Sequence, residues 1–514
     1  MNVGRLYRTI RWLKPRQIWY QVWRRVQRRW EIRRLAPATR DSKPGAPSRA
    51  TAFGEEPGLA TAAAGELPAF TFLNLTAKPK GWNDTSLDLL WRYNLHYFDF
   101  LVATSATLPL AGGLSARALI ERWIAENPRG GAPGWDPYPT SLRIVNWVKW
   151  LDRNAPSPHL RASLAEQVAW LERHVEWHIQ ANHLLANLKA LILGNRFLER
   201  DDSRWLRLYR AQIDEQVLPD GGHFERSVMY HAIILEDVLD VMRFCGADAA
   251  GLKPIAARML RYLVNMTGPD GRIVLFNDAA DGIAKPTPEL CEAARSLGVE
   301  PADVEAFIDF PQTGYARLTA GDFVLFVDAA PIGPDYQPGH AHADTLTYEL
   351  YYKGRKVVVD AGTSAYCGVR RAFERSTAAH NVVEVDGRDS SEVWSSHRVG
   401  ARARIVMRRV EPGRVVAAHD GYGFAVGRAF RLSREGLTIV EKVAGTGDCV
   451  TRVHVTPAFS ESGLILDGGL GNGGGWTDEN FEYAVAFGEL EKGRCVAKRF
   501  GGGELEYTIR RADT

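Results

Sequence analysis

The sequence changes character near residue 310, and this change constrains the fold more than any other feature. Upstream of it, apolar residues recur at three- and four-residue spacing, as in 233–242, which predicts helices. Downstream, short β-branched runs such as 323–327 alternate with Gly, Asp and Asn turns, which predicts antiparallel strands. We therefore expect a helical domain over residues 67–310 and a β domain over residues 311–514.

Neither half contains a strict repeat. The helices could close into an α/α barrel or form an open helical array, and the β half is typical of an antiparallel sandwich of two sheets. Lys353-Gly354 predicts a two-residue hairpin turn. No apolar run is long enough for a transmembrane helix. The five cysteines are scattered without CxxC spacing, which argues against a disulfide framework or a cysteine-based zinc site.

The first 66 residues form a separate leader. Residues 1–35 hold eleven Arg or Lys and one Glu, whereas the rest of the chain holds 53 basic and 60 acidic residues. Ile18, Val22, Val26 and Trp30 recur every four residues, which predicts an amphipathic helix. Such a helix could lie on an anionic membrane surface, or pack its aromatic face on the body of the protein. Nothing else in the chain supports nucleic-acid binding.

The leader lacks the 7–15-residue apolar core of a standard signal peptide. We therefore expect a cytoplasmic or membrane-surface location, with export to the periplasm still open. Residues 36–66 are rich in Ala, Pro, Gly and Ser, which is typical of a linker. The sequence specifies no oligomeric state.

The segment Gly339-His340-Ala341-His342-Ala343-Asp344 carries the clearest chemical signal. It precedes a strand-like run over 345–352, and side chains two residues apart on an extended segment face the same side. The two imidazoles could therefore face one metal ion or one substrate. Asp360 and His380 follow in the same domain, and imidazole with carboxylate is an ordinary zinc ligand set. The alternative is a pair of surface histidines in a polar loop.

Two further polar clusters lie in the helical half. Asn182-His183 precedes an apolar helical stretch, where an Asn often serves only as an N-cap. The segment 220–231 contains a turn followed by Tyr230 and His231, which could be no more than a half-buried helix face.

Taken together, these segments resemble the heparinase II/III-type polysaccharide lyases. The matching pieces occur in the family's order across roughly residues 85–460: Asn182-His183, Glu225 to His231, Gly339 to Asp344, Val359 to Gly362, and Ala379 to Asn381. The resemblance implies an incomplete α/α toroid followed by an antiparallel β-sandwich. It also implies β-elimination on a uronic-acid polysaccharide, giving unsaturated uronate ends.

The resemblance also assigns roles. Asn182 and His183 would neutralise the substrate carboxylate, so that the C5 proton becomes acidic enough to remove. Tyr230 would protonate the departing glycosidic oxygen, and would also be the base when both events occur on one face of the sugar. His340 would be the base for the other stereochemistry, although His342 could exchange roles with it.

A divalent metal, expected to be structural zinc, would be held by His342, Asp360 and His380; no organic cofactor is implied. A tight hairpin at 353–354 pairs Asp360 with about Thr347, which leaves it about 17 Å along the strand from His342. Either the strand bends or starts later, or Asp360 is not a ligand.

Other polar and aromatic residues are candidates for contacting an anionic polysaccharide. They are Tyr93, His96, Trp135, Arg226 and Arg371. Packing between helices explains the aromatic ones equally well, and a solvated loop explains the arginine at 371.

Three other functions use some of the same residues. A cupin-like metal enzyme would carry a Glu four or five residues after His342, where this chain has Leu346 and Thr347. A polysaccharide-binding or scaffold protein could keep the fold without the activity. A uronate epimerase would remove the C5 proton without expelling a leaving group. We expect a lyase acting on an anionic polysaccharide, one made by the same cell.

Overall fold

A computed structural model describes residues 3–35, 66–102, 115–468 and 475–512, with the backbone alone for 27–35. The chain forms two compact units, Lys14–Leu208 and a second one made of Met1–Leu13 with Tyr209–Thr514. The change from helix to strand lies in 296–306, close to the predicted domain boundary at 310.

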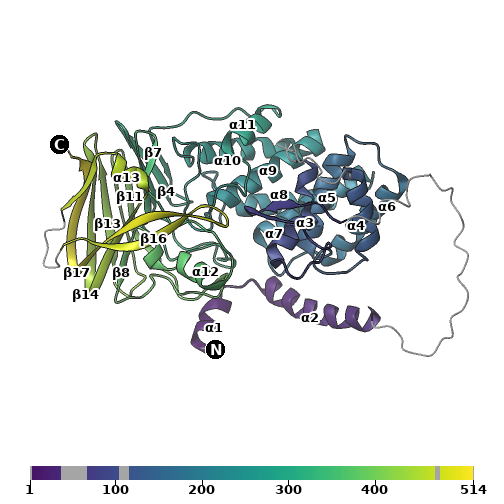
Figure 1. The fold of residues 1–514 in the computed structure, drawn as a ribbon, viewed down its shortest axis with the longest axis horizontal. Helices are drawn as coiled ribbons and strands as arrows, with labels where there is room; N and C mark the ends of the chain where they lie inside the picture. Colours follow the sequence, from purple (N-terminus) through teal and green to yellow (C-terminus); the bar gives the residue numbers. More distant parts are fainter. Residues whose placement is uncertain (1–2, 36–65, 103–114, 469–474, 513–514) are drawn as a thin grey trace, which may run out of the picture. The chain divides into compact units, whose positions relative to one another are not determined.

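The first unit is helical. Its helices end or begin at polar caps, such as Ser157, whose side chain accepts from Leu160 N at the start of α6. Fully buried tryptophans, including Trp123 and Trp147, fill the space between helices. The helices of this unit are α2 (Pro15–Leu35), α3 (Leu89–Tyr97), α4 (Ala116–Glu126), α5 (Pro137–Leu151), α6 (Pro158–His174), α7 (Ala181–Phe197) and the first part of α8 (Ser203–Gln216), beside the hairpin of β1 (Phe70–Phe72) and β2 (Leu75–Ala77) (Figure 1).

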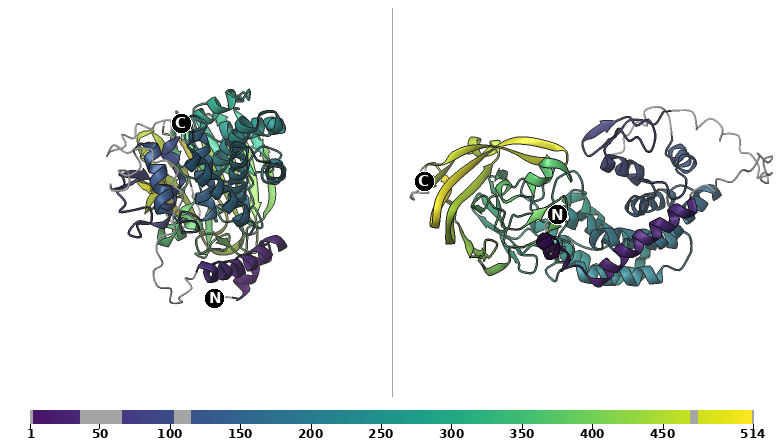
Figure 2. Two further views of the ribbon diagram at one scale, coloured as in Figure 1. Left: turned by 90° about the vertical axis from the view of Figure 1, so that its right-hand side faces the viewer. Right: turned by 90° about the horizontal axis from the view of Figure 1, so that it is seen from below.

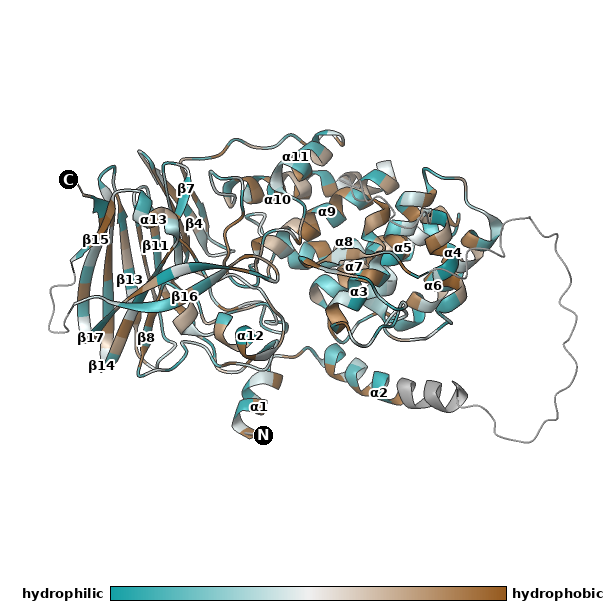
Figure 3. Cartoon of the chain, in the orientation of Figure 1, coloured by the Kyte–Doolittle hydropathy of each residue, from teal (hydrophilic) through white to brown (hydrophobic). Residues whose placement is uncertain are grey.

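The second unit continues with helices and then becomes antiparallel sheet (Figures 1 and 2). Its helices include α9 (Val228–Cys245), α10 (Lys253–Asn265), α11 (Thr287–Arg295) and α12 (Gly368–Glu374). Hydrophobic and hydrophilic residues alternate along its strands, as expected for a sheet with one buried face (Figure 3). The main strands are β3 (Phe307–Phe310), β4 (Tyr315–Ala320), β5 (Phe323–Asp328), β6 (Tyr348–Tyr352), β7 (Arg355–Val358), β8 (Val383–Val385), β11 (Ile405–Glu411), β12 (Arg414–His419), β13 (Val426–Leu432), β14 (Gly436–Val455), β15 (Leu464–Gly468), β16 (Thr477–Ala486) and β17 (Glu489–Arg511).

The predicted order of helices followed by antiparallel strands is confirmed. The prediction of two separate sheets differs from the observed hydrogen bonding, because the main strands join one 13-stranded sheet. The 20-residue β14 pairs with β13, β17, β8 and β7 along its length, so this one strand connects the parts of the sheet.

The β6–β7 hairpin and the residue at which β6 begins determine the course of the segment Gly339–Asp344. Lys353 and Gly354 have φ of 47° and 79° and join β6 to β7 in a two-residue turn, as predicted. The run predicted as strand from 345 forms β6 only from Tyr348, because the chain turns at Leu346, where φ is 78°. Thr347 N donates to Asp344 O at 2.8 Å to close this turn. The strand therefore starts three residues later than residue 345, which is one of the alternatives that the sequence left open.

The predicted leader helix is present as two helices, α1 (Val3–Ile10) and α2. The Trp30 side chain and the linker residues 36–65 lie outside the described part of the chain. Among the described residues, no helix is long and apolar enough to cross a membrane.

A buried ion pair ties the sheet to the histidine loop. The Arg428 guanidinium on β13 binds Glu441 on β14 in two places, and both side chains are 1% exposed. Arg428 also donates to the carbonyls of Leu346, at 2.8 Å, and Asn381. One charged side chain thus holds the turn before β6 and the segment after His380.

Replacing Arg428 by Met should destabilise the protein by about 3–5 kcal/mol, because Glu441 is left as a buried unpaired charge. Denaturant unfolding followed by circular dichroism measures this change. Arg431→Met on the same strand is the matched control, since Arg431 and its partner Glu506 are each 55% exposed; it should cost less than about 1 kcal/mol. Equal effects of the two substitutions would contradict this role.

Candidate functional site

The two histidines of the Gly339–Asp344 segment share one carboxylate. His340 Nδ1 lies 2.8 Å from Asp278 Oδ2, and His342 Nε2 lies 2.7 Å from Asp278 Oδ1. The imidazoles do face a common partner, as their spacing suggests, but that partner is an aspartate of the same unit. The two rings therefore use different nitrogens toward it.

Asp278 is held ionised by its surroundings. Burial opposes its charge, yet the guanidinium of Arg371 and the hydrogen bonds from the two histidines outweigh burial and keep its pKa well below the usual range. Arg371 binds both carboxylate oxygens, and Thr363 Oγ1 donates to Oδ1 at 3.1 Å. An ionised carboxylate only accepts hydrogen bonds.

The charge on Asp278 fixes the tautomer of each histidine. Its oxygens accept from Nδ1 of His340 and from Nε2 of His342, so those nitrogens carry the protons of the neutral rings. The lone pair of His340 is then on Nε2 and that of His342 is on Nδ1. One carboxylate thus gives two neighbouring imidazoles opposite tautomers.

Tyr230, near the start of α9, lies against His340. Their ring centroids are 3.8 Å apart, and Tyr230 Oη is 2.9 Å from Tyr366 Oη. Glu225 Oε1 is 3.9 Å from His340 Nε2, and its other oxygen is 3.7 Å from His223 Nδ1. The structure therefore brings a phenol and an imidazole with an accepting nitrogen side by side.

The free nitrogen of His342 belongs to a second, fully buried cluster. His342, Asp344 and His380 each offer one ligand atom, and these atoms lie within 4.8 Å of one another. His342 Nδ1 and His380 Nε2 are buried and have no hydrogen-bond partner in the described part of the chain. Burial and the neighbouring Asp360, against the attraction of His380, raise the pKa of Asp344 to about 6.

Asp360 lies behind this cluster. Its Oδ1 is 2.9 Å from His380 Nδ1, and its Oδ2 accepts from Thr347 Oγ1 at 2.7 Å. Despite burial, His380 and Thr347 lower the pKa of Asp360, so His380 carries its proton on Nδ1. Asp360 therefore contacts Thr347, the residue near which the hairpin places it, through a side-chain hydrogen bond, although the β6–β7 ladder shifts register at Leu350 and ends at Val358. In the cluster of possible ligands, Asp344 stands in the place predicted for Asp360.

Asn182 and His183 lie in the other compact unit, at the start of α7. Gln180, not Asn182, is the N-cap residue, so the N-cap interpretation is wrong. His183 Nδ1 is 3.2 Å from Glu176 Oε2, and its ring lies 4.4 Å from that of Tyr138. The role of Asn182 and His183 in neutralising a substrate carboxylate stays a prediction.

The three aromatic candidates of the helical unit have structural partners. His96 is fully buried and accepts from Trp123 Nε1 at 2.9 Å, and Trp135 is 4% exposed and donates to Asn127 O. Tyr93 is half-buried and donates to Asp136 at 2.8 Å. Packing between helices accounts for His96 and Trp135, while sugar contact by Tyr93 stays a prediction.

The two arginine candidates bind protein atoms in the described structure. Arg226 donates to the carbonyls of Thr313, Phe224 and Gln312. Arg371 is 1% exposed, so the interpretation of its segment as a solvated loop is wrong at this residue. The Arg226 guanidinium holds the turn at 312–313 and the Arg371 guanidinium holds Asp278, and the contact of either with substrate stays a prediction.

Four residues of the site have no role that the sequence predicts: Asp278, Glu225, Tyr366 and Asp344. Glu225 and Asp344 lie inside the motifs that carry the family resemblance, so their position in the sequence is a signal for them. Asp278 follows Phe276-Asn277 in a loop with no periodicity, and only the fold brings it to residues 340–342.

Two family models match consecutive parts of the chain. The model of the heparinase II/III N-terminus matches residues 121–292, and that of the heparinase II/III-like C-terminal part matches residues 302–501. Each half of the chain therefore matches its counterpart in the same family.

Curated relatives are distant. A heparin-sulfate lyase of Bacteroides stercoris is 22% identical over 304 residues, which cover 51% of this chain and 45% of that protein. The FtsZ-localized protein C of Caulobacter vibrioides is 24% identical over 309 residues, which cover 57% of this chain and 52% of that protein. The matches span about half the length of these relatives.

The crystal structure of heparinase III has a similar fold. It superposes with a TM-score of 0.63 at 15% identity, over 82% of this chain and 76% of that one. This likeness confirms the predicted fold of an α/α toroid followed by an antiparallel β-sandwich.

Replacing Arg371 by Met should raise the pH at which the protein unfolds in acid. A carboxyl whose folded-state pKa is depressed contributes stability above its unfolded value of about 3.9, and this stability is lost as pH falls through the folded value. Without Arg371, the folded pKa of Asp278 rises and the loss occurs at higher pH. Near-ultraviolet circular dichroism across an acid titration measures the midpoint. Arg388→Met, at an arginine 57% exposed, should leave it unchanged.

Proposed function

Because the chain belongs to the heparinase II/III-type family, we propose that it is a polysaccharide lyase that cleaves a uronic-acid-containing polysaccharide by β-elimination. The observation that carries this proposal is the contact between Tyr230 and His340, with the His340 tautomer set by Asp278. This contact supports the proposal because the reaction needs a base and an acid, and an imidazole and a phenol lie side by side in one compact unit.

The chemistry assigns a task to each group. The base takes the proton from C5 of the uronate, the electrons form the C4–C5 double bond, and the bond from C4 to the glycosidic oxygen breaks. That oxygen leaves with a proton from the acid. The substrate carboxylate carries the developing negative charge and must be neutralised by nearby donors.

His340 suits the role of base. Its Nε2 carries the lone pair, while Asp278 stabilises the imidazolium that forms when this nitrogen takes a proton. The His340 side chain is 14% exposed, so a substrate atom can reach it. The buried Glu225 carboxyl group lies 3.9 Å from Nε2, on the side of the ring opposite Asp278.

Tyr230 suits the role of acid. Its hydroxyl is hydrogen-bonded to that of Tyr366, which positions the phenol and gives it a partner when the proton leaves. If both proton transfers occur on one face of the sugar, Tyr230 serves in both and His340 orients it. Burial and the Asp278 charge raise the pKa of Tyr366, so this second hydroxyl stays protonated.

A catalytically altered polysaccharide-binding protein, or a uronate epimerase, is the alternative. The Caulobacter relative, which is named for localisation with FtsZ, is as similar to this chain as the Bacteroides lyase is. Ultraviolet absorbance of an unsaturated product separates a lyase from both alternatives. Exchange of the C5 hydrogen with solvent without such absorbance would indicate the epimerase.

On a panel of heparan sulfate, hyaluronan, alginate and bacterial exopolysaccharides, the wild type should release unsaturated uronate. Tyr230→Phe and His340→Ala should each lower kcat by a factor on the order of 10²–10⁴, because each removes a proton-transfer group.

His159→Ala, at an exposed histidine of the helical unit, is the matched control and should retain full activity. Absence of unsaturated product from every uronan would reject the lyase proposal. Full turnover by Tyr230→Phe would reject the role of Tyr230 alone.

The buried His342–Asp344–His380 cluster fits a divalent metal, and zinc matches its donor set of two imidazoles and a carboxylate. Two lone-pair nitrogens face no hydrogen-bond donor in the described residues, and each ring is fixed from behind by Asp278 or Asp360. An ion here would supply structural support, since it would hold the loop that carries His340.

Metal analysis of purified variants tests this ligand set. His342→Ala and Asp344→Asn should lose the metal, whereas Asp360→Asn should bind it roughly 10–100-fold more weakly because only the orientation of His380 changes. Asp467→Asn, at an exposed position, should bind as the wild type does. If Asp360→Asn lost all bound metal and Asp344→Asn kept it, Asp360 would be the ligand and Asp344 the residue that only supports the site.

A further inference from the structure

The two N-terminal helices expose their apolar side chains and contact the protein through polar ones. On α2, Ile18, Trp19, Val22, Trp23 and Val26 are between 44% and 65% exposed. Their spacing places all five on one face of the helix. We call this face the α2 stripe.

The opposite face of α2 makes specific contacts within its own compact unit. Gln17 is 1% exposed and donates to the carbonyl of Ile179, and Arg24 lies 2.8 Å from His178 Nε2. Tyr20 lies against Trp177, with ring centroids 6.1 Å apart. The helix is therefore oriented by polar and aromatic contacts on one side, with its aliphatic and tryptophan side chains on the other.

Helix α1 repeats this arrangement in the other unit. Val3, Tyr7 and Ile10 are 80%, 63% and 43% exposed, at a spacing that puts them on one face. Arg5 and Arg8 on the other face both bind the carboxylate of Glu392 at 2.8 Å. Each of the two helices therefore exposes its apolar face, whereas an ordinary surface helix buries that face against its own domain.

This orientation costs free energy in water. An amphipathic helix on a globular protein normally buries its apolar face, because each large apolar side chain gains roughly 1.5–3 kcal/mol on burial. Apolar patches that stay exposed and are bordered by polar residues mark interaction surfaces. The predicted face of Ile18, Val22 and Val26 is 44–52% exposed, so these three side chains do not pack on the body of the protein; the Trp30 side chain lies outside the described part of the chain.

The charge around the α2 stripe is positive. Arg16 and Arg25 are exposed and border the stripe on its two sides. Residues 1–35 contain eleven basic residues and one acidic residue. Tryptophan with arginine on one exposed helix is the composition of helices that lie in the headgroup region of a bilayer.

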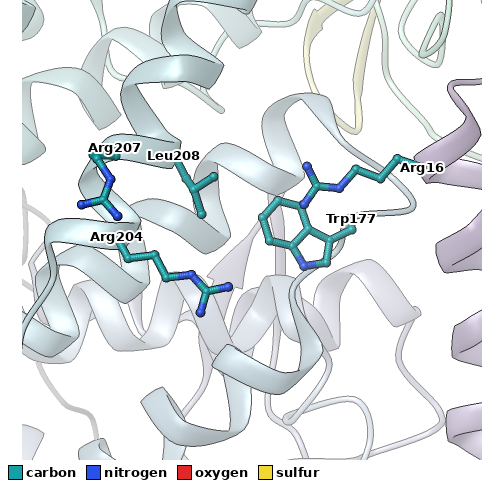
Figure 4. Close-up of a pocket in the computed structure, with 5 residues that line it drawn as sticks. All are labelled: Arg16, Trp177, Arg204, Arg207 and Leu208. Carbon is teal, nitrogen blue, oxygen red and sulfur yellow. The ribbon is translucent and has the colours of Figure 1, made fainter.

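A pocket beside α2 adds to this positive charge. It has a volume of about 250 Å³ and is lined by Arg16, Trp177, Arg204, Arg207 and Leu208 (Figure 4). The Arg16 guanidinium lies 3.8 Å from the centre of the Trp177 ring (Figure 4), and the Arg204 guanidinium lies 4.8 Å from the centre of the Trp205 ring. No acidic side chain lines the pocket, so its three guanidinium groups suit a phosphate or another anionic headgroup.

We propose that α2 docks the helical unit on an anionic lipid bilayer, with the α2 stripe entering the headgroup region and the Arg16–Arg204–Arg207 pocket receiving a lipid phosphate. Insertion of the tryptophans supplies apolar burial, and the arginines supply attraction to anionic lipid. The helical unit is thereby held at the surface through residues that take no part in the Tyr230–His340 site.

Sedimentation of the full-length protein with vesicles tests the proposal. Vesicles of phosphatidylcholine with phosphatidylglycerol should bind the wild type, vesicles of phosphatidylcholine alone should bind it much more weakly, and added salt should release it. Trp19→Glu with Trp23→Glu should weaken binding by at least about tenfold, since both side chains must then leave the apolar region. Arg204→Gln with Arg207→Gln should reduce the preference for anionic vesicles.

The matched control is Val406→Glu with Leu490→Glu, which changes two apolar residues that are 54% and 42% exposed elsewhere on the surface. It should bind vesicles as the wild type does, and thermal unfolding should show that all variants are folded. Binding that is equal for neutral and anionic vesicles, or unchanged by the tryptophan substitutions, overturns the proposal. So does a self-association of the free protein that the tryptophan substitutions abolish, because a second copy would then cover the stripe.

Discussion

The ionised carboxylate of Asp278 is the interaction on which the rest of the site depends. It is buried, and Arg371 together with two histidines compensates for the cost of that burial. Because the carboxylate can only accept, it fixes the proton of His340 on Nδ1 and that of His342 on Nε2. The imidazole proposed as the base and the imidazole proposed as a metal ligand thus differ in the nitrogen that each turns toward the same aspartate.

The fold makes this sharing geometrically feasible. The turn at Leu346 ends the histidine loop before β6 starts, so that His342 reaches His380 while Asp360, further along the hairpin, contacts His380 from the other side. Arg428 holds the Leu346 carbonyl from the sheet. The buried Arg428–Glu441 pair of the sheet thus contacts both the turn that ends the histidine loop and the segment that follows His380.

Much of the architecture follows from periodicity in the sequence, because helices and strands bury their apolar residues at different spacings. The two-residue hairpin turn at Lys353-Gly354 was also predictable, whereas the shift of the β6–β7 register at Leu350 was not. Asp278 was not, because its role comes from contacts with residues more than 60 positions away. For helix α2, the sequence predicted the amphipathic pattern but not which face contacts the protein. That depends on tertiary contacts such as the hydrogen bond from Gln17 to Ile179.

The most direct test of this account is a neutron crystal structure of the deuterium-exchanged protein near neutral pH, which locates the ring deuterium of each histidine. The account predicts deuterium on Nδ1 of His340 and on Nε2 of His342, with both oxygens of Asp278 free of deuterium. A deuterium on Asp278, or the same nitrogen protonated in both histidines, would contradict the claim that one carboxylate divides the two imidazoles between catalysis and metal support.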